Sequence, residues 1–195
     1  MENTMIFALI STIIYLIGAI PYTIGIIRGE VLPHPFSYGT WIVLVGINNI
    51  VLFQENAGWT LLPAIVQFVF MVVNVIGGCF AFRKIQINWF DYFCLGLAIL
   101  SLFIWWKVGV EYAVIMTVIV DAIAFLPTIK KGWIQPHSEY IWPWINSALF
   151  PIFLILSLKS PIFITVFFWA YLFISSGSLS IMLWYRQRLI PKELS

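Results

Sequence analysis

The sequence has 195 residues, 62% of them hydrophobic and 9% charged, and a formal net charge of +2. A water-soluble domain carries about 25% charged residues, so this chain has too little polar surface to face water, and lipid is its expected solvent. The small net charge argues against a basic nucleic-acid-binding surface, and we expect no nucleic-acid partner.

Long charge-free runs predict transmembrane helices. No Asp, Glu, Lys or Arg occurs in residues 3–27, 57–82 or 160–185, and each run exceeds the roughly 20 residues that cross a bilayer core. The runs are continuously apolar rather than alternating, which favours helices over a β-barrel.

Seven apolar segments follow one another with short connections and form one membrane domain, residues 1–195. Their predicted bounds are 5–27, 40–55, 58–82, 91–107, 110–130, 140–158 and 161–185. The fourth segment is charge-free only from Tyr92 to Trp106, and the fifth contains Glu111 and Asp121. If either of these two segments does not cross the membrane, the number of spans falls to six or five.

The distribution of Lys and Arg predicts the orientation, because cytoplasmic loops carry an excess of both residues. With seven spans, one side holds eight of them and the other side holds only Lys107 and Lys159. The eight are Arg28, Arg83, Lys84, Lys130, Lys131, Arg186, Arg188 and Lys192. We therefore expect a plasma (inner) membrane protein with its N-terminus outside and its C-terminus in the cytoplasm. The N-terminus lacks the basic start of a signal peptide, so the first span is expected to be retained.

The two halves of the chain resemble each other. Residues 19–24 near the end of the first span and residues 125–130 in the fifth both contain a proline and precede a basic loop. Pro33 then precedes Trp41 by the spacing with which Pro136 precedes Trp144; a second register pairs Pro35 and Trp41 with Pro136 and Trp142. This order predicts two three-helix repeats, 5–82 and 110–185, joined by a linker helix at 91–107. Each repeat has an odd number of helices, so one added helix between them lets both repeats run in the same direction, as in transporters with parallel repeats.

The chain resembles the PQ-loop and SWEET-like superfamily in the order of its motifs. A proline late in the first helix of a triplet is followed by a basic loop, and then by Pro-x-Ser and a Trp. Residues 127–139 are the closest stretch, and the chain resembles an uncharacterised bacterial branch. The Gln that follows the proline in that motif is replaced by Tyr22 and Thr128. The resemblance implies a substrate site between the triplets, but the superfamily also contains KDEL receptors and lysosomal amino-acid exporters, so the fold does not fix the cargo.

The same resemblance bears on the solute. Asn74 matches the third-helix position from which SWEET-like proteins offer an Asn to the substrate. The counterpart region of the last span has Ser175, Ser176 and Ser178 instead. The symmetric Asn pair is therefore absent, which argues against a sugar.

Polar residues near the middle of the predicted spans are the candidate substrate-binding set. At 1.5 Å per residue, Asp121 lies about 9 Å from Pro127, near the middle of its span. Tyr15 occupies the corresponding repeat position, six residues before Pro21. The set consists of Asp121, Asn74, Asn146, Asn48, Asn49, Gln67, Tyr15 and Trp144.

Each of these residues has two interpretations. An ionised Asp at the bilayer centre costs roughly 2.5–3.5 kcal/mol, so Asp121 is either a proton-coupling or substrate-binding carboxylate in a wet cavity, or a neutral side chain hydrogen-bonded between helices. The amides either line a pocket or bond neighbouring helices. Trp144 either stacks on a solute or anchors the interface. Pro21 and Pro127 are hinges or simply end their helices, and His34 and His137 are expected to be solvated loop residues.

No enzyme motif occurs: the chain has no HExxH, no GxSxG, no Walker loop and no paired-Cys motif. We expect no catalytic residue, metal or cofactor, and we expect Cys79 and Cys94 to be small core residues. The leading hypothesis is a transporter of a small polar solute that works by alternating access, with protons as a candidate coupling ion. The alternative is a non-transporting membrane receptor or assembly factor, and the sequence leaves open whether the chain forms a homo-oligomer. A water-filled cavity that reaches Asp121 would favour transport. A dry, fully packed centre would favour the non-transporting receptor or assembly factor.

Overall fold

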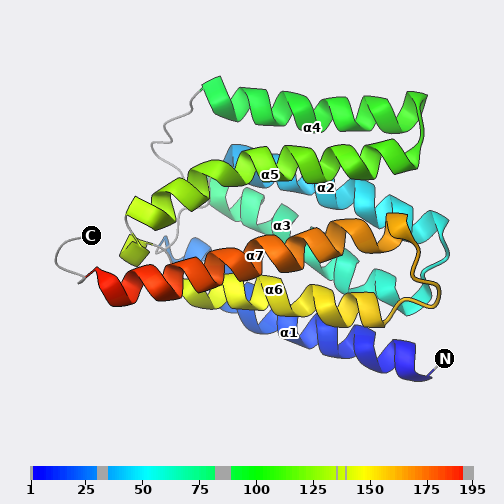
Figure 1. The fold of residues 1–195 in the computed structure, drawn as a ribbon, viewed down its shortest axis with the longest axis horizontal. Coiled ribbons are helices and arrows are strands. Elements are labelled where there is room, and N and C mark those ends of the chain that lie inside the picture. The colour runs from blue at the N-terminus through cyan, green and yellow to red at the C-terminus, as the bar shows by residue number, and fades with distance from the viewer. Residues whose placement is uncertain (1, 30–34, 82–88, 135, 139, 191–195) are drawn as a thin grey trace.

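The computed structural model describes residues 2–29, 35–81, 89–134, 136–138 and 140–190. Those residues form an all-helical bundle without strands (Figure 1). The helices are α1 (Glu2–Ile27), α2 (Pro35–Gln54), α3 (Leu61–Ala81), α4 (Trp89–Lys107), α5 (Val110–Ile134), α6 (Ile141–Leu156) and α7 (Phe163–Leu189), with short 3-10 helices η1 (Gly58–Thr60) and η2 (Pro136–Ser138). The predicted all-α class is confirmed.

Four of the described helices are long and apolar enough to cross a membrane, which indicates a membrane protein. Their apolar stretches are Glu2–Ile27, Gly58–Gly77, Glu111–Ile134 and Phe163–Leu189. The other three, Tyr38–Gln54, Tyr92–Lys107 and Ile141–Leu156, are apolar but shorter. The span predicted at 140–158 shrinks because Tyr140 is extended (φ −83°, ψ 131°) and α6 ends at Leu156.

The outward face of α1 shows why lipid must surround the bundle. Its exposed large side chains fall every three or four residues and form one apolar stripe. They are Ile6, Leu9, Ile13, Ile17, Ile20, Ile24 and Ile27. At 1.5 Å per residue the stripe is about 32 Å long, which matches the hydrocarbon core of a bilayer, about 30 Å. A shallow apolar depression of about 310 Å³ lies on this face, over Ile13, Leu16, Ile17, Ile20 and Pro21.

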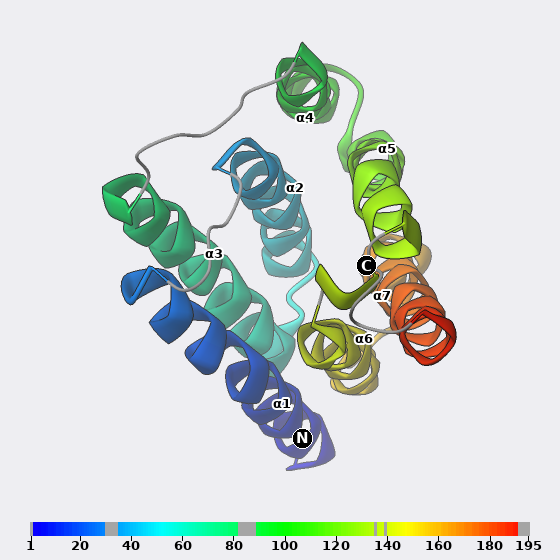
Figure 2. The ribbon, with the colours of Figure 1, turned by 90° about the vertical axis from the view of Figure 1, so that its left-hand side faces the viewer.

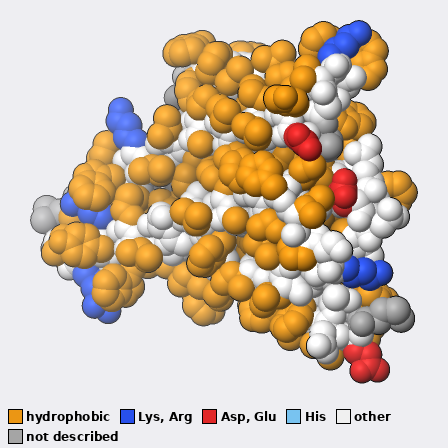
Figure 3. All heavy atoms as spheres, turned by 45° about the vertical axis from the view of Figure 1, so that its right-hand side comes forward, with side chains coloured by type: hydrophobic (Ala, Val, Ile, Leu, Met, Phe, Trp, Pro, Cys, Tyr) orange, Lys and Arg blue, Asp and Glu red, His pale blue; other side chains and the backbone are white. Residues whose placement is uncertain are grey.

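Charged side chains gather at the two ends of the bundle, with an apolar belt between them (Figure 3). Successive helices alternate in direction, so the two chain termini lie at opposite ends (Figure 1). Among the side chains that the structure describes, one end, called the basic end here, has Arg28, Lys130, Arg186 and Arg188. The opposite end, the acidic end, has Glu2, Glu55, Glu111, Lys107 and Lys159. Arg83, Lys84 and Lys192, which the orientation prediction also used, lie outside the described residues, as do Pro33, His34 and Glu139.

Contacts at the basic end correct the interpretation of His137. Its Nε2 lies 2.7 Å from the backbone oxygen of Ile190, so it is a half-buried contact between η2 and the end of α7 rather than a solvated loop residue. Arg186 donates from Nε and Nη2 to the Trp133 carbonyl, at 3.0 and 2.8 Å. A cation on the last carbonyls of α5 suits the helix dipole, and the two contacts fasten α7 to the end of α5.

The helices pack in a pattern that repeats (Figure 2). The third helix, α3, packs against both α1 and α2, and α7 packs against both α5 and α6. Between these two groups, α1 packs along α6, and α2 packs less extensively on α5 and α7. Helix α4 lies at the edge of the bundle, against α5 and α2.

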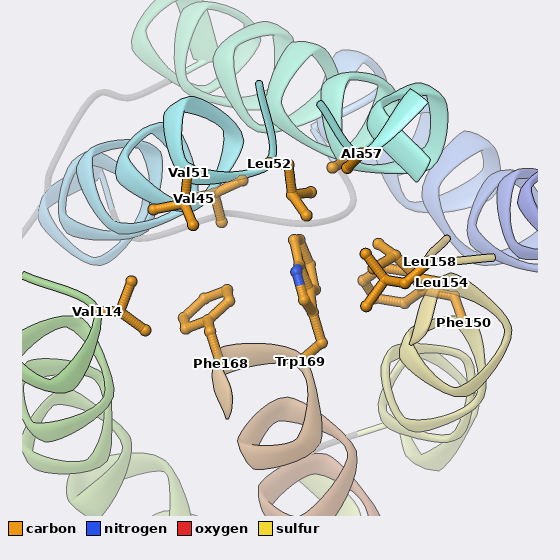
Figure 4. Close-up of a cluster of buried hydrophobic side chains, with 11 residues drawn as sticks. Val45, Val51, Leu52, Ala57, Val114, Phe150, Leu154, Leu158, Phe168 and Trp169 are labelled. Carbon is orange, nitrogen blue, oxygen red and sulfur yellow. The ribbon is translucent and has the colours of Figure 1, made fainter. Parts of the chain in front are cut away.

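The largest hydrophobic core, named the acidic-end core, lies in the half of the bundle nearest the acidic end and joins both groups of helices (Figure 4). It consists of Val45, Val51, Leu52, Ala57, Ala64, Val114, Phe150, Leu154, Leu158, Phe168 and Trp169. Two hydrogen bonds reinforce it across the groups: the Ser157 hydroxyl to Thr60 Oγ1 at 2.9 Å, and Ser11 Oγ to the Phe150 carbonyl at 2.8 Å. This half of the bundle is therefore closed.

Candidate functional site

Asp121 lies at the middle of α5 and is 5% exposed. Its polar neighbours among the described side chains are the Trp41 indole from α2 and the Tyr171 hydroxyl from α7, and no basic side chain is among them. The Tyr171 hydroxyl is buried and makes no hydrogen bond of ordinary geometry. Asp121 is thus a buried carboxylate between the two groups of helices, with polar neighbours and no charged partner.

A set of aromatic and polar side chains extends from Asp121 into the first group of helices. The rings of Trp41 and Tyr38 meet edge to face with centroids 5.2 Å apart, and Tyr38 stacks on Tyr22 at 6.3 Å. The Tyr38 side chain interacts with the amide of Asn74, whose oxygen accepts a hydrogen bond of 2.7 Å from the Thr23 hydroxyl. We name this set the midplane cluster after Asp121, and it extends from there towards the basic end, where Tyr22, Thr23 and Tyr38 lie. It comprises Tyr22, Thr23, Tyr38, Trp41, Asn74, Asp121 and Tyr171.

A second polar region lies where α1, α3 and α6 meet. Tyr15 packs edge to face against Phe150, with ring centroids 5.2 Å apart, and its hydroxyl donates to the Gln67 carbonyl at 3.4 Å. Asn146 lies against Gly18, where a Cβ atom would stand 2.7 Å from the amide nitrogen. The Gln67 Oε1 and Asn146 Nδ2 atoms are buried without a hydrogen-bond partner.

Asn48 and Asn49 are neighbours in sequence but serve different interfaces. Asn48 Nδ2 donates to the Leu44 carbonyl and, at 3.4 Å, to Thr117 Oγ1 on α5. Asn49 Nδ2 donates to the Ala64 carbonyl on α3 at 3.2 Å, while its Oδ1 is buried and unpartnered. Both amides therefore bond neighbouring helices, and Asn49 keeps one free acceptor.

The remaining predicted residues lie away from the midplane cluster. Trp144 packs on Phe125 with ring centroids 5.5 Å apart, in a small core near the basic end together with Leu179 and Leu183. The two prolines do not end their helices, because α1 continues to Ile27 and α5 to Ile134. The backbone at Pro21 and Pro127 thus lacks a helical N–H donor inside a continuing helix, which is the setting a hinge requires.

The structure thus brings Asp121 and Asn74 into one cluster, through Tyr38 and Trp41. It places Tyr15, Gln67 and Asn146 in a second region and uses the other amides to bond helices. Sequence reasoning missed Tyr38 and Tyr171 as site residues. A signal for Tyr171 existed: tyrosine prefers membrane interfaces, so one in the middle of a long apolar run needs a polar partner at depth.

Neither of the two best-formed depressions in the described residues reaches Asp121. One is the lipid-facing depression on α1. The other, of about 320 Å³, lies at the acidic end between the loops that follow α2 and α6, and is lined by Glu55, Asn56, Ala57, Leu158, Lys159, Ser160 and Thr165. In this conformation the acidic-end core therefore lies between that depression and the midplane cluster.

The described residues contain no group of three His, Cys, Asp or Glu side chains that would hold a metal ion. Comparisons of the chain with protein-family models, with curated proteins and with solved structures found no match.

Proposed function

We propose that the protein transports a small polar solute by alternating access between two three-helix units. The observation that carries the proposal is the set of buried polar side-chain atoms without partners among the described residues: Thr40 Oγ1, Asn49 Oδ1, Gln67 Oε1, Asn146 Nδ2 and the Tyr171 hydroxyl. An unpartnered polar group in an apolar interior costs about 1–3 kcal/mol by mutational measurement. Donors and acceptors from a bound solute would complete these bonds.

The proposed architecture is two parallel repeats, α1–α3 and α5–α7, with α4 as the linker helix. It is supported by equivalent packing: α3 packs against the other two helices of its unit, α1 and α2, and α7 packs in the same way against α5 and α6. The contacts between the units support it too: a two-fold axis that exchanges the units turns the α1–α6 contact into the α5–α2 contact. Parallel repeats about an axis along the membrane normal place the substrate site at the repeat interface. Membership of the PQ-loop and SWEET-like superfamily belongs to the same proposal.

In the proposed cycle the present conformation is closed at the acidic end. The acidic-end core and the Thr60–Ser157 bond join the units there, whereas the small core of Phe125, Leu179 and Leu183 near the basic end belongs to one unit alone. Opening the acidic end would separate Thr60 from Ser157 and Leu52 from Trp169. Pro21 and Pro127, both in the half nearest the basic end, are the proposed hinges.

All seven helices are proposed to cross a plasma (inner) membrane, with the N-terminus outside and the basic end in the cytoplasm. The described charged side chains at the basic end are all cationic, whereas Glu2, Glu55 and Glu111 lie at the other end together with Lys107 and Lys159. This asymmetry agrees with the positive-inside rule.

The test of the proposed function is a solute screen followed by transport. Purified protein in lipid nanodiscs is screened by thermal shift against sugars, amino acids, vitamins, nucleosides and amines at pH 5.5 and 8. Each stabilising solute is then measured for uptake into proteoliposomes. Uptake above that of empty liposomes, and lower in the Asn146→Ala variant, is the expected result; binding without uptake would contradict transport.

One observation favours the alternative, a non-transporting membrane receptor or assembly factor. The best-formed depressions in the described residues leave Asp121 untouched, so in this conformation no open path to the candidate site is evident among them. A receptor of this kind would bind a protein partner and show no solute uptake in the same assay.

A further inference from the structure

We propose that the midplane cluster binds a small organic cation, such as a protonated amine or a quaternary ammonium group, between the Asp121 carboxylate and the rings of Trp41, Tyr38 and Tyr171. The inference rests on the proposed function and specifies its substrate class. It follows from the charge of the site, from the kind of side chains around it and from the contrast with three tryptophans that have a Lys or Arg side chain over the ring.

The charge of the site favours a cation. Asp121 is buried at the middle of α5, and its described polar neighbours, Trp41 and Tyr171, carry no positive charge. The described Lys and Arg side chains lie at the two ends of the bundle. A buried carboxylate is stable in apolar surroundings only when it is protonated or paired with a cation. A neutral solute would leave the charge of Asp121 uncompensated, and an anionic solute would be repelled.

The surrounding rings favour an organic cation over a metal ion. The face of an indole or phenol ring attracts a cation within about 6 Å of its centroid, and tryptophan does so best. Trp41, Tyr38 and Tyr22 form a continuous series of rings, with successive centroids 5.2 and 6.3 Å apart. The described residues provide no second carboxylate and no group of metal ligands here. One carboxylate beside several rings is the arrangement that recognises ammonium groups.

Three tryptophans at the ends of the bundle supply a contrast. At the ends of the bundle, Trp106 carries Lys107 over its ring at 3.9 Å, Trp133 carries Arg186 at 4.4 Å and Trp184 carries Arg188 at 3.8 Å. Each of these rings is therefore occupied by a cation of the protein itself. The ring and hydrogen-bonding partners of Trp41 among the described residues are Tyr38 and Asp121, neither of which is a cation, and its other described neighbours are apolar. The proposed solute supplies the cation at this site.

The same geometry predicts competition between the cation and a proton. The groups that face Asp121 from its neighbouring helices are Trp41 on α2 and Tyr171 on α7, while α4 contributes the apolar Leu97 and Ala98 to the adjoining core. A phenol is uncharged near neutral pH, so Asp121 is the group that changes charge. Either a proton or one organic cation neutralises it, and the protein would exchange the two across the membrane, one for one.

The experiment uses two probes of the same shape, choline and its neutral isostere 3,3-dimethyl-1-butanol. Binding to the wild-type protein in nanodiscs is measured by isothermal titration calorimetry at pH 5.5, 7 and 8. The variants are Asp121→Asn, Trp41→Leu and Trp41→Phe. Their matched controls are Glu111→Gln, an exposed acid on the same helix, and Trp142→Leu, an exposed tryptophan.

We expect choline to bind at least tenfold more tightly than its neutral isostere and to weaken by up to about tenfold per pH unit towards acid. Asp121→Asn should lower choline affinity at least tenfold and abolish its dependence on pH. Trp41→Leu should lower choline affinity about tenfold. Trp41→Phe should lower it less, because phenylalanine keeps an aromatic ring that attracts cations, although less strongly than tryptophan. Glu111→Gln and Trp142→Leu should change the affinity less than twofold.

The comparison of the two probes needs no variant, so the inference can be tested even if a variant fails to fold. Equal binding of choline and its isostere, or choline binding that Asp121→Asn leaves unchanged, would overturn the inference. If neither choline nor other amines bind while a neutral solute from the broad screen is transported, the cation inference fails and the proposed function stands. If no solute of any class binds, both fail.

Discussion

The bundle differs between its acidic-end half and its middle layer: the first is filled by apolar side chains, and the second contains buried polar ones. Near the acidic end, apolar side chains from both units interdigitate around Phe168 and Trp169, which are 2% and 1% exposed. In the middle layer, the side chains between the units include Asp121, Trp41 and Tyr171, and the Tyr171 hydroxyl is unpartnered. The first region gains stability from close packing, whereas the second leaves a buried polar group unsatisfied. The proposed function therefore assigns stability and ligand recognition to different depths of one interface, and mutations should separate them.

The largest loss of stability is expected from Trp169→Ala. It removes a fully buried ring from the acidic-end core, and the cavity should lower the free energy of unfolding by about 3–5 kcal/mol. Thermal unfolding in detergent measures the change. Trp142→Ala is the control, because Trp142 is 64% exposed and should change stability far less. Equal losses in the two variants would contradict the assignment of the core.

A smaller loss is expected where Gly18 of α1 lies against Asn146 of α6. A Cβ at residue 18 would lie 2.7 Å from Asn146 Nδ2 and 3.0 Å from its Cβ, so Gly18→Ala forces the helices apart and should cost about 1–3 kcal/mol. At Gly96, in α4, a Cβ meets nothing within 4 Å. Gly96→Ala should therefore be neutral or slightly stabilising in the same unfolding assay, and a loss there would contradict this account of α4.

The bond between Thr60 and Ser157 should contribute less still. Ser157→Ala removes the buried hydrogen bond between the units, together with the 2.6 Å bond from Ser157 Oγ to the Leu154 carbonyl, and should lower stability by about 0.5–1.5 kcal/mol. Ser180→Ala is the comparison, because the Ser180 hydroxyl also bonds a backbone carbonyl three or four residues earlier, at 2.8 Å, and the difference between the two variants isolates the bond to Thr60. If Ser180→Ala costs as much as Ser157→Ala, the bond between the units has no special role.

The smallest effect on stability, and the largest on pH dependence, is expected from Asp121→Asn. The amide is nearly isosteric with the carboxylic acid, so fold and expression should be kept. The pH dependence of uptake should disappear, because no group facing that position can then change charge. Asn74→Ala and Asn146→Ala should instead weaken solute binding at every pH. Proteoliposome uptake with and without a pH gradient distinguishes the two classes, and unchanged pH dependence in Asp121→Asn would leave Asp121 a purely structural residue.

The sequence predicted where the helices lie better than where they end. Hydropathy locates an apolar run, but the backbone helix continues past it wherever polar side chains reach water or a partner. The span predicted at 161–185 thus extends to Leu189. In this last turn Arg186 donates to the Trp133 carbonyl on α5, and Arg188 packs back over the ring of Trp184. Conversely, α6 is shorter than predicted because the chain turns at Tyr140.

The position of a residue along its helix was predictable from sequence, but the residues that it contacts were not. Counting residues placed Asp121 at the middle of its span, where the structure has it. Its neighbour Tyr171 depends on which face α7 turns towards α5, and apolar runs without strong periodicity do not specify that face. Asn48 and Asn49 illustrate the same limit, since adjacent residues point to α5 and to α3.

The central claim is that the two units separate at the acidic end while the midplane cluster opens to that side. It is tested most directly by labelling Asn74→Cys with a membrane-impermeant thiol reagent, added from one face at a time, in a background with Cys79 and Cys94 replaced. The same protein is compared with and without a Thr60→Cys/Ser157→Cys cross-link. We predict labelling from both faces without the cross-link, and loss of labelling from the acidic-end face alone when the cross-link forms. Labelling from a single face whatever the state of the cross-link, or from neither face, would contradict alternating access.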